Sequence, residues 1–295
     1  MSILSVQNLS KNYGAIRALK GISFSVPEGS VFGILGPNGS GKTTLLGIIM
    51  SVLRASGGGY LLFDETPTDA HRRQMGTLLE TPNFYHYLSA VQNLKIAAAI
   101  KGHGHDDIDR VLEVVNLTHR KHSPFSSYSL GMKQRLAIGS ALLGNPDVLV
   151  FDEPTNGLDP VGIAEIRDLI KALSRQGKTI IMASHLLDEV EKVCTHVAIL
   201  KQGDLVVSGN VNEIFVHEDV VELAADDLDQ LDTALQELPG LIKKSREAAS
   251  ICLFYPRGQV NLAQINAFCF SKGVTLNHLQ MKKKSLESKF FELTN

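Results

Sequence analysis

Apolar residues in the first part of the chain recur in short runs of strand length. Residues 3–9, 21–26 and 31–35 are β-type runs separated by turn residues, which predicts several strands at the start of a sheet. Between residues 42 and 53 the apolar positions instead follow a helical period, directly after a glycine-rich segment. The pattern therefore predicts a strand, a glycine-rich loop and a helix in direct succession.

Three further apolar runs, residues 148–152, 179–184 and 195–200, alternate with helical segments. This alternation predicts an α/β fold with a parallel sheet. Between about residues 84 and 145 the pattern is helical, which we interpret as a helical insertion.

The pattern restarts after residue 215 as strand, helix, strand, strand, helix, strand. This order predicts a small α+β accessory domain of ferredoxin-like topology over residues 216–295, after a first domain over residues 1–215. Two domains also agree with the length of 295 residues.

Composition narrows the function classes. A formal net charge of −2 offers no electrostatic basis for binding nucleic acid. The sequence has no run of about 18 apolar residues and no secretory signal at its start, so we expect a cytoplasmic chain. The three cysteines are widely spaced, which favours reduced thiols.

Residues 36–43, GPNGSGKT, match the phosphate-loop pattern G-x-x-x-x-G-K-[ST] between a predicted strand and a predicted helix. The glycines let backbone amides face an anion, and the helix presents its positive end to it. Lys42 adds a cation toward the β and γ phosphates, and the Thr43 hydroxyl is suited to hold Mg²⁺. This loop alone indicates a nucleoside triphosphate, since kinases, GTPases and many ATPases share it.

Asp152 and Glu153 end a run of apolar residues, where phosphate-loop enzymes offer a carboxylate to Mg²⁺. Asp152 fits the metal role, and Glu153 could polarise an attacking water as general base. A solvated acidic turn is the weaker alternative, because the apolar strand runs directly into both acids.

Residues 128–136, YSLGMKQRL, lie just ahead of this strand and resemble the signature sequence of ABC-type ATPases, usually LSGGQ. Over about residues 3–215 the chain is similar to that family, which implies a RecA-like phosphate-loop NTPase core with an antiparallel N-terminal β part. The resemblance implies that Ser129 and Gly131 contact ATP bound on an opposite subunit, that Tyr13 stacks on adenine, that Asp159 belongs to the D-loop and that His185 is the switch histidine.

The expected site therefore has three groups of residues. The expected catalytic residues are Glu153, His185 and Lys42, and the expected Mg²⁺ ligands are Thr43, Asp152 and Glu80. The residues expected to bind ATP are Tyr13, Gly36, Pro37, Asn38, Gly39, Ser40, Gly41, Lys42, Thr43, Thr44, Ser129, Gly131 and Asp159.

Glu80 departs from the family, which usually has a glutamine at this position. The chain has this glutamate, the SLGM signature and the tail SLESKFFELT at residues 285–294. In these features it resembles the branch that serves ABC-2 type exporters, either bacitracin-resistance-like or gliding-type. An added negative charge beside Asp152 and Glu153 puts the ligand role of Glu80 in doubt.

The segment NFYHYL at residues 83–88 carries three aromatic residues after Glu80. One interpretation is that Tyr85 and Tyr87 anchor a coupling helix of a separate membrane subunit. The alternative, that these rings pack the insertion against the core, is equally supported.

The resemblance implies an ATP-hydrolysing subunit that pairs with a second copy or a related ATPase and powers a separate transmembrane permease. Export is what the resemblance to the ABC-2 branch implies. Through that permease it would lie on the inner face of the cell membrane. Two rivals lack support: ribosome-acting or DNA-repair relatives would carry two nucleotide units or a coiled coil, and a small-molecule kinase would not need the YSLGM element.

Overall fold

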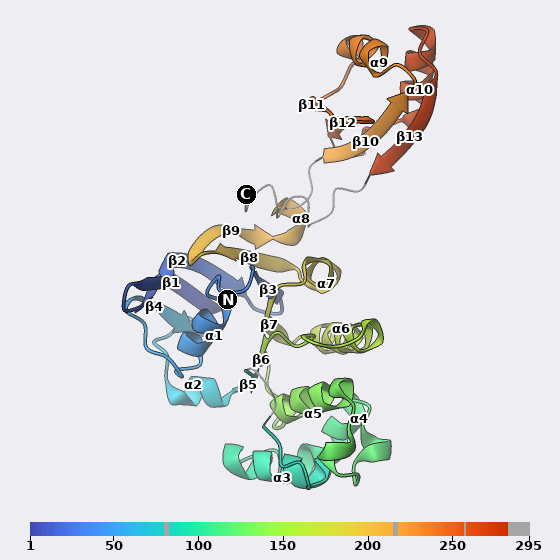
Figure 1. Cartoon of the computed structure of the whole chain (residues 1–295). Coiled ribbons are helices and arrows are strands. Elements are labelled where there is room, and N and C mark those ends of the chain that lie inside the picture. The colour runs from blue at the N-terminus through green and yellow to red at the C-terminus, as the bar shows by residue number, and fades with distance from the viewer. Residues whose placement is uncertain (80–82, 215–217, 257, 283–295) are drawn as a thin grey trace. The chain divides into compact units, whose positions relative to one another are not determined.

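The computed structural model describes residues 1–79, 83–214, 218–256 and 258–282. Its contacts divide the chain into two compact units, Met1–Val211 and Asn212–Asn295 (Figure 1). The predicted boundary between residues 215 and 216 and the predicted tail at 285–294 lie outside the described residues.

A six-stranded sheet forms the centre of the first unit. The order along the sheet is β5 (Met75–Leu78), β6 (Val148–Asp152), β7 (Thr179–Ser184), β3 (Val31–Leu35), β8 (His196–Lys201) and β9 (Asp204–Asn210). Five of these strands pair in parallel and β9 pairs antiparallel with β8. The predicted parallel α/β core is confirmed.

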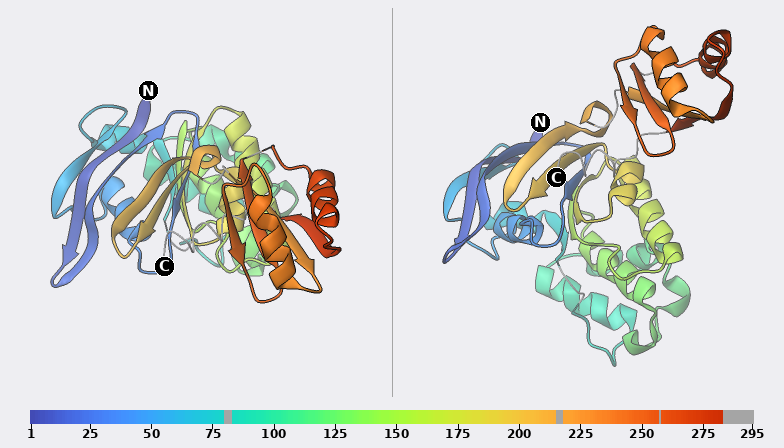
Figure 2. Two further views of the ribbon diagram at one scale, coloured as in Figure 1. Left: turned by 90° about the horizontal axis from the view of Figure 1, so that it is seen from above. Right: turned by 45° about the horizontal axis from the view of Figure 1, so that its top comes forward.

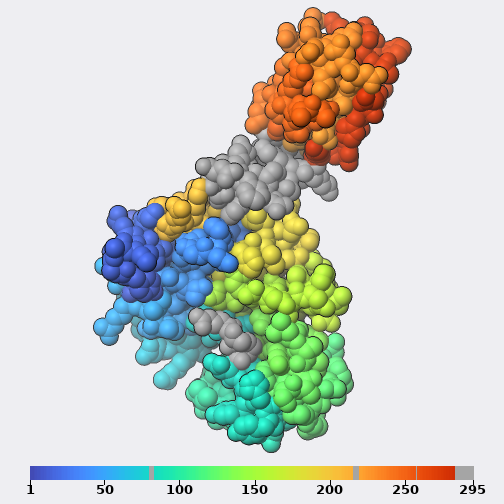
Figure 3. Space-filling model, in the orientation of Figure 1, coloured from blue at the N-terminus to red at the C-terminus, as the bar shows by residue number. Residues whose placement is uncertain are grey.

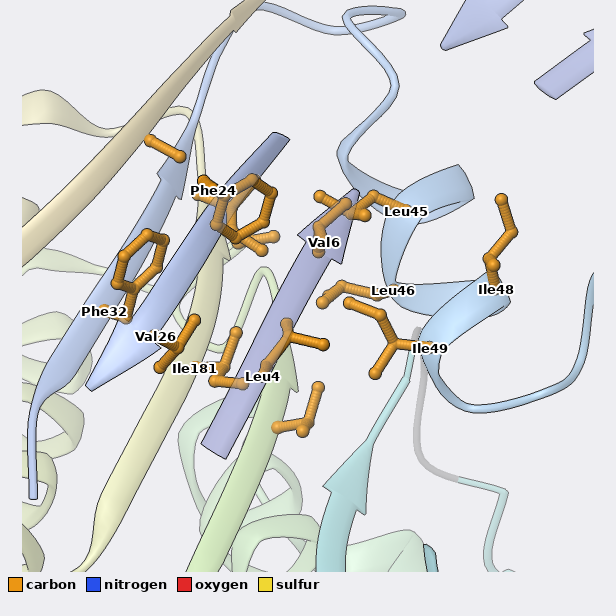
Figure 4. Packing of buried hydrophobic residues seen from close by; sticks show 14 of the residues in the cluster. Leu4, Val6, Phe24, Val26, Phe32, Leu45, Leu46, Ile48, Ile49 and Ile181 are labelled. Atoms are coloured by element: carbon orange, nitrogen blue, oxygen red, sulfur yellow. The ribbon is translucent and has the colours of Figure 1, made fainter. Parts of the chain in front are cut away.

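A second, antiparallel sheet is formed mainly by the N-terminal part of the chain, as predicted. Its order is β2 (Ile16–Pro27), β1 (Ser2–Tyr13) and β4 (Gly57–Leu62). Apolar residues of this sheet and of the parallel sheet enclose α1 (Lys42–Ile49) in one core, in which the rings of Phe24 and Phe32 stack at 5.4 Å (Figure 4).

Helices cover both faces of the parallel sheet. Helix α1 lies on one face, and α5 (Leu130–Leu142), α6 (Pro160–Arg175) and α7 (Leu187–Val193) lie on the other, which the further views in Figure 2 also show. The short α2 (Asp69–Arg73) and α8 (Val211–Ile214) follow β4 and β9.

The predicted helical insertion contains α3 (Ala90–Lys101), α4 (Ile108–Val114) and α5, which form one lobe of the first unit (Figure 3). Single turns of 3-10 helix at His105–Asp107, Thr118–Arg120 and Phe125–Ser127 connect them. Ser89 begins α3 with a capping box, since its hydroxyl accepts from the Gln92 amide while the Gln92 side chain accepts from the Ser89 amide.

Helix α1 ends four residues before the predicted end at Leu53. Ser51 adopts a left-handed backbone with φ of 62°, and the Leu53 amide donates back to the Gly47 carbonyl at 2.9 Å. This turn stops the helix and folds the Leu53 side chain onto Gly47, so Leu53 keeps an apolar contact without being helical.

The second unit has the predicted element order. It comprises β10 (Glu218–Ala225), α9 (Leu228–Ala234), a 3-10 turn at Leu235–Glu237, β11 (Lys243–Arg246), β12 (Ile251–Pro256), α10 (Leu262–Ser271) and β13 (Leu276–Lys282). Its antiparallel sheet has the order β11-β12-β10-β13, a ferredoxin-like topology, and its own apolar core includes Leu223, Leu253 and Ile265.

Among the residues that the structure describes, every helix is too short or too polar to cross a lipid bilayer.

Replacing Phe151 by alanine should lower the free energy of unfolding by about 3–5 kcal/mol, because this ring is fully buried in β6 next to Asp152. Chemical denaturation of the purified chain measures the change. Val52→Ala, at a side chain that is 71% exposed, is the control and should shift stability little. Equal effects of the two substitutions would contradict the packing of β6.

Glu222 should make the stability of the second unit depend on pH. Hydrogen bonds from Lys282 and Ser250 lower the pKa of this carboxyl below its ordinary value of 4.5. A lowered folded-state pKa contributes stability above the unfolded value, and this is lost as pH falls through the folded value. The stability deficit of Glu222→Gln should therefore be full at neutral pH and shrink in acid. Urea unfolding at several pH values tests this, with the exposed Glu113→Gln as control.

Candidate active site

Three neighbouring strands of the parallel sheet end at one edge and deliver the central site residues. Asp152 of β6 pairs with Ala183 of β7, and Ser184 of β7 pairs with Leu35 of β3. Since carboxyl ends of parallel strands meet at the same edge, the segments that follow these strands leave the sheet together. They begin with Gly36, Glu153 and His185.

The loop at residues 36–41 is closely packed against two other segments. A Cβ atom at Gly36 would lie 2.3 Å from the Leu200 carbonyl oxygen, and one at Gly41 would lie 2.6 Å from that of Ala18. Gly41 also has φ of 107°, in the left-handed region. The two positions therefore require glycine, and the resulting turn leads directly into the N-terminus of α1.

Within this loop, Pro37, Asn38 and Gly39 are exposed and Ser40 is buried. The Ser40 carbonyl accepts from the Gly203 amide, which ties the loop to the β8–β9 turn. Thr43 and Thr44, in the first turn of α1, are exposed and half-buried respectively.

Lys42 turns back over the loop. Its Nζ donates to the carbonyls of Gly36 at 2.8 Å and Pro37 at 3.3 Å, and lies 3.4 Å from Oε1 of Glu153. Its side chain is only 6% exposed, so the ammonium group needs these oxygens to replace water. The structure thus joins the predicted Lys42 and Glu153 directly.

Glu153 occupies an unusual backbone conformation. Its φ is 47°, in the left-handed region, and its amide donates to the Ala183 carbonyl at 3.0 Å. Non-glycine residues persist there only where surrounding contacts compensate the cost. The conformation directs Oε2 to Nδ1 of His185 at 2.8 Å. A carboxylate only accepts, so the histidine Nδ1 donates.

Asp152 is the last residue of β6 and is 4% exposed. Thr43 is the second residue of α1, and α1 packs against β6. A carboxylate and a hydroxyl are oxygen donors of the kind that Mg²⁺ prefers, so both residues fit the predicted metal role. The third predicted ligand, Glu80, lies outside the described residues.

Tyr13 ends β1 and pairs with Ile16 of β2, so it lies in the hairpin whose Ala18 carbonyl contacts the position of Gly41. Its ring is 45% exposed, with Lys11 Nζ 4.9 Å from the ring centre. The partly exposed ring is accessible to a ligand.

Ser129 and Asp159 cap helices instead of contacting Lys42 or Glu153. The Ser129 hydroxyl accepts from the Met132 amide at 3.3 Å and Asp159 Oδ1 accepts from the Gly162 amide at 2.8 Å. Ser129 is exposed, and among the described residues no atom outside the adjoining helix backbone lies within 4 Å of the Cβ position at Gly131. In the described part of the chain, no hydrogen bond joins these residues to the loop.

A groove of about 620 Å³ lies between β5 and helices α3 and α5. Tyr85 lines it together with Ile96 and Ile100. Phe84 packs edge-on against the buried Phe125, whereas Tyr85 and Tyr87 are 51% and 76% exposed. The two interpretations of the aromatic segment therefore apply to different residues: Phe84 serves packing, and the tyrosines are open to solvent.

Sequence reasoning missed the residues that hold the site in place. The carbonyls of Ala18, Ala183 and Leu200 shape the loop and anchor Glu153, but a backbone group leaves no signal in residue type. The buried Glu189, four residues after His185, was also missed. A charged residue on the apolar face of a short helix was the signal that could have found it.

Comparisons with known proteins identify the family of this chain. Residues 19–156 match the ABC transporter family. The ABC transporter ATP-binding protein YhcH of Bacillus subtilis is 35% identical over 99% of this chain and 96% of its own length. The bacitracin transport ATP-binding protein BcrA of Enterococcus faecalis is 38% identical over 72% of this chain and 70% of its own.

Solved structures of ABC ATP-binding proteins have a fold similar to that of this chain. CbiO1 from Clostridium perfringens, part of the ABC transporter complex CbiONQ, has a TM-score of 0.66 and 31% identity over 81% of this chain and 96% of its own. A dimeric ATP-binding cassette in a post-hydrolysis state with ADP and Pi has a TM-score of 0.62 and 26% identity over 70% of this chain and 98% of its own. Since its sequence matches YhcH over nearly the full length of both proteins, this chain belongs to the ATP-binding proteins of ABC transporters.

Proposed function

We propose that this chain powers export by a separate membrane-spanning permease, through ATP-driven pairing with a second ATP-binding subunit. That it is an ATPase subunit of a transporter follows from its family. The observation that carries the proposal is the Glu153 carboxylate, which contacts both Lys42 and His185 at the mouth of the phosphate loop.

The loop residues Gly36, Pro37, Asn38, Gly39, Ser40 and Gly41, with Lys42, Thr43 and Thr44, would bind the phosphates of ATP. Backbone amides of the loop and the N-terminus of α1 supply the electrostatic attraction. The exposed ring of Tyr13 would stack on the adenine. Lys42 is already directed at the loop interior by its contacts with two loop carbonyls.

Thr43 and Asp152 would hold Mg²⁺, with Glu80 as a further candidate ligand. Bound there, the ion would neutralise negative charge on the β and γ phosphates. Asp152 is nearly fully buried, so a cation would also offset the cost of its charge.

Hydrolysis requires a group that removes a proton from the attacking water, and Glu153 is placed for it. Its oxygen would accept that proton while the water oxygen bonds to the γ-phosphorus and the bond to the β-γ bridging oxygen breaks. His185 fixes the orientation of the carboxylate through its Nδ1 contact. Once phosphate oxygens engage Lys42, its contact with Glu153 weakens and one carboxylate oxygen is released for water.

The second subunit would complete the site. Ser129 and Gly131 lie at the exposed N-terminus of α5, where amides and the helix dipole favour an anion. Asp159, at the start of α6, would lie beside them at the interface. These residues do not reach their own loop, which supports a role at the site of a partner subunit.

Permease docking is best supported at the groove beside α3. The rings of Tyr85 and Tyr87 contact each other at 6.0 Å and are both exposed next to it. Aromatic side chains beside a groove are typical anchors for a partner helix. Through this contact the chain would be held at the inner face of the membrane. Similarity to a bacitracin transport protein supports export.

Glu153→Gln should lower ATP hydrolysis by about 10²- to 10⁴-fold, because the amide cannot accept the water proton. Binding of ATP should persist, so the variant should accumulate as an ATP-bound dimer. Steady-state phosphate release and size-exclusion chromatography with ATP measure the two effects. Lys42→Ala is the control: it should weaken ATP binding and remain monomeric. A Glu153→Gln chain that stays monomeric with ATP contradicts the proposal.

Tyr85→Ala combined with Tyr87→Ala should reduce recovery of the permease by at least about tenfold, since removing buried aromatic anchors costs on the order of 1–2 kcal/mol each. Affinity purification of the tagged chain from solubilised membranes, with the permease quantified by mass spectrometry, measures this. Phe270→Ala removes a similarly exposed ring, 74% against 76% for Tyr87, and should leave recovery unchanged. Full recovery with the double variant refutes docking through these rings.

A further inference from the structure

Three helices on one face of the parallel sheet each begin beside a candidate site residue. Ser129 caps α5, Asp159 caps α6, and His185 lies two residues before α7. Helix α6 packs against both of its neighbours (Figure 1). A shift of one helix relative to the next therefore moves two parts of the site relative to each other.

Helix α7 has little stability of its own. It has seven residues, and the residue before it, Leu186, offers no side-chain cap. A helix this short is not stable in isolation, so tertiary contacts must hold it. One contact is apolar: Val190 and Cys194 pack onto Gly33 of β3, where a Cβ atom would lie 2.9 Å from Val190 Cγ1.

The other contact is an ion pair between α6 and α7. Nη1 of Arg167 lies 3.3 Å and 3.4 Å from the two carboxylate oxygens of Glu189. The Glu189 side chain is 10% exposed and also accepts from Lys192 Nζ at 3.2 Å. The carboxylate is thus surrounded by two cations, one from its own helix and one from α6.

A buried ion pair contributes little net stability, because desolvation of the charges offsets their attraction. Its effect is on geometry: without Arg167 the Glu189 carboxylate keeps Lys192 of its own helix, so this ion pair no longer fixes α7 against α6 and α7 can shift. Glu189 lies four residues after His185, about one helical turn, so such a movement displaces the start of α7 and the loop that carries His185.

We propose that Arg167 and Glu189 are positioning residues that hold the His185 loop in place relative to α6, so that His185 contacts Glu153. The inference rests on the proposed hydrolytic role of Glu153. Neither residue touches the phosphate loop, whose Lys42 is on the first turn of α1, on the opposite face of the sheet. The pair should therefore affect turnover and leave ATP binding unchanged.

The test measures kcat and KM for ATP in the purified full chain. Arg167→Met and Glu189→Gln should each lower kcat by about 10- to 100-fold, as expected for misplacement of a group by about 1 Å, with KM unchanged. The double variant should lose little more than either single variant, because both remove the same contact. Additive losses, a change in KM alone, or an unchanged kcat would overturn the proposal.

Two variants separate positioning from general destabilisation. Arg167→Lys retains a single cationic donor, and only one nitrogen of Arg167 makes the contact, so it should restore most of kcat relative to Arg167→Met. If Arg167→Met does not fold, Arg167→Lys compared with Glu189→Gln makes the same distinction. Glu165, also on α6, forms a more exposed pair with Arg135 of α5 at 3.6 Å, and Glu165→Gln should leave kcat unchanged.

Glu153→Gln, assayed in parallel, distinguishes the two hypotheses. If it hydrolyses ATP at the wild-type rate, the proposed role of Glu153 fails. If it is inactive while Arg167→Met and Glu189→Gln retain full kcat, only the positioning role fails.

Discussion

The contact of one carboxylate with two side chains from different segments is the interaction on which this site depends. Glu153 meets Lys42 from the phosphate loop and His185 from the loop after β7. It can do so because β3, β6 and β7 are neighbours and end at one edge. The left-handed backbone of Glu153, held by the Ala183 carbonyl, then sets the direction of its side chain.

The two faces of the parallel sheet carry different parts of the site. On one face, α1 extends from the loop that would bind the phosphates of ATP, and it is enclosed in the apolar core shared with the antiparallel sheet. On the other face, α5 and α6 begin at Ser129 and Asp159, which would serve a partner subunit, and α7 begins two residues after His185. The contacts between these helices include ion pairs. Such pairs contribute little net stability, but they fix the position of one helix relative to the next. The second unit has a separate apolar core.

Much of the fold could be predicted from local patterns. Apolar runs ending in turn residues located β3, β6, β7 and β8, and the order of elements in the second unit predicted its sheet topology. The end of α1 could not be predicted from periodicity, because Leu53 remains apolar while it folds back onto Gly47. Strand β9, which pairs antiparallel at the edge of a parallel sheet, depends on a turn and not on its own composition.

For the site, the sequence by itself determined which chemical groups are present: the glycine-rich loop with Lys42 and Thr43, the paired acids Asp152 and Glu153, and the signature around Ser129 and Gly131. Only the tertiary structure decided which of them meet. Lys42, Glu153 and His185 converge, whereas Ser129 and Asp159 cap their own helices away from them. The physical reason is that the order of strands in a sheet, and the burial of a pair such as Arg167 and Glu189, arise from contacts between segments distant in the chain, which no local pattern of residues encodes.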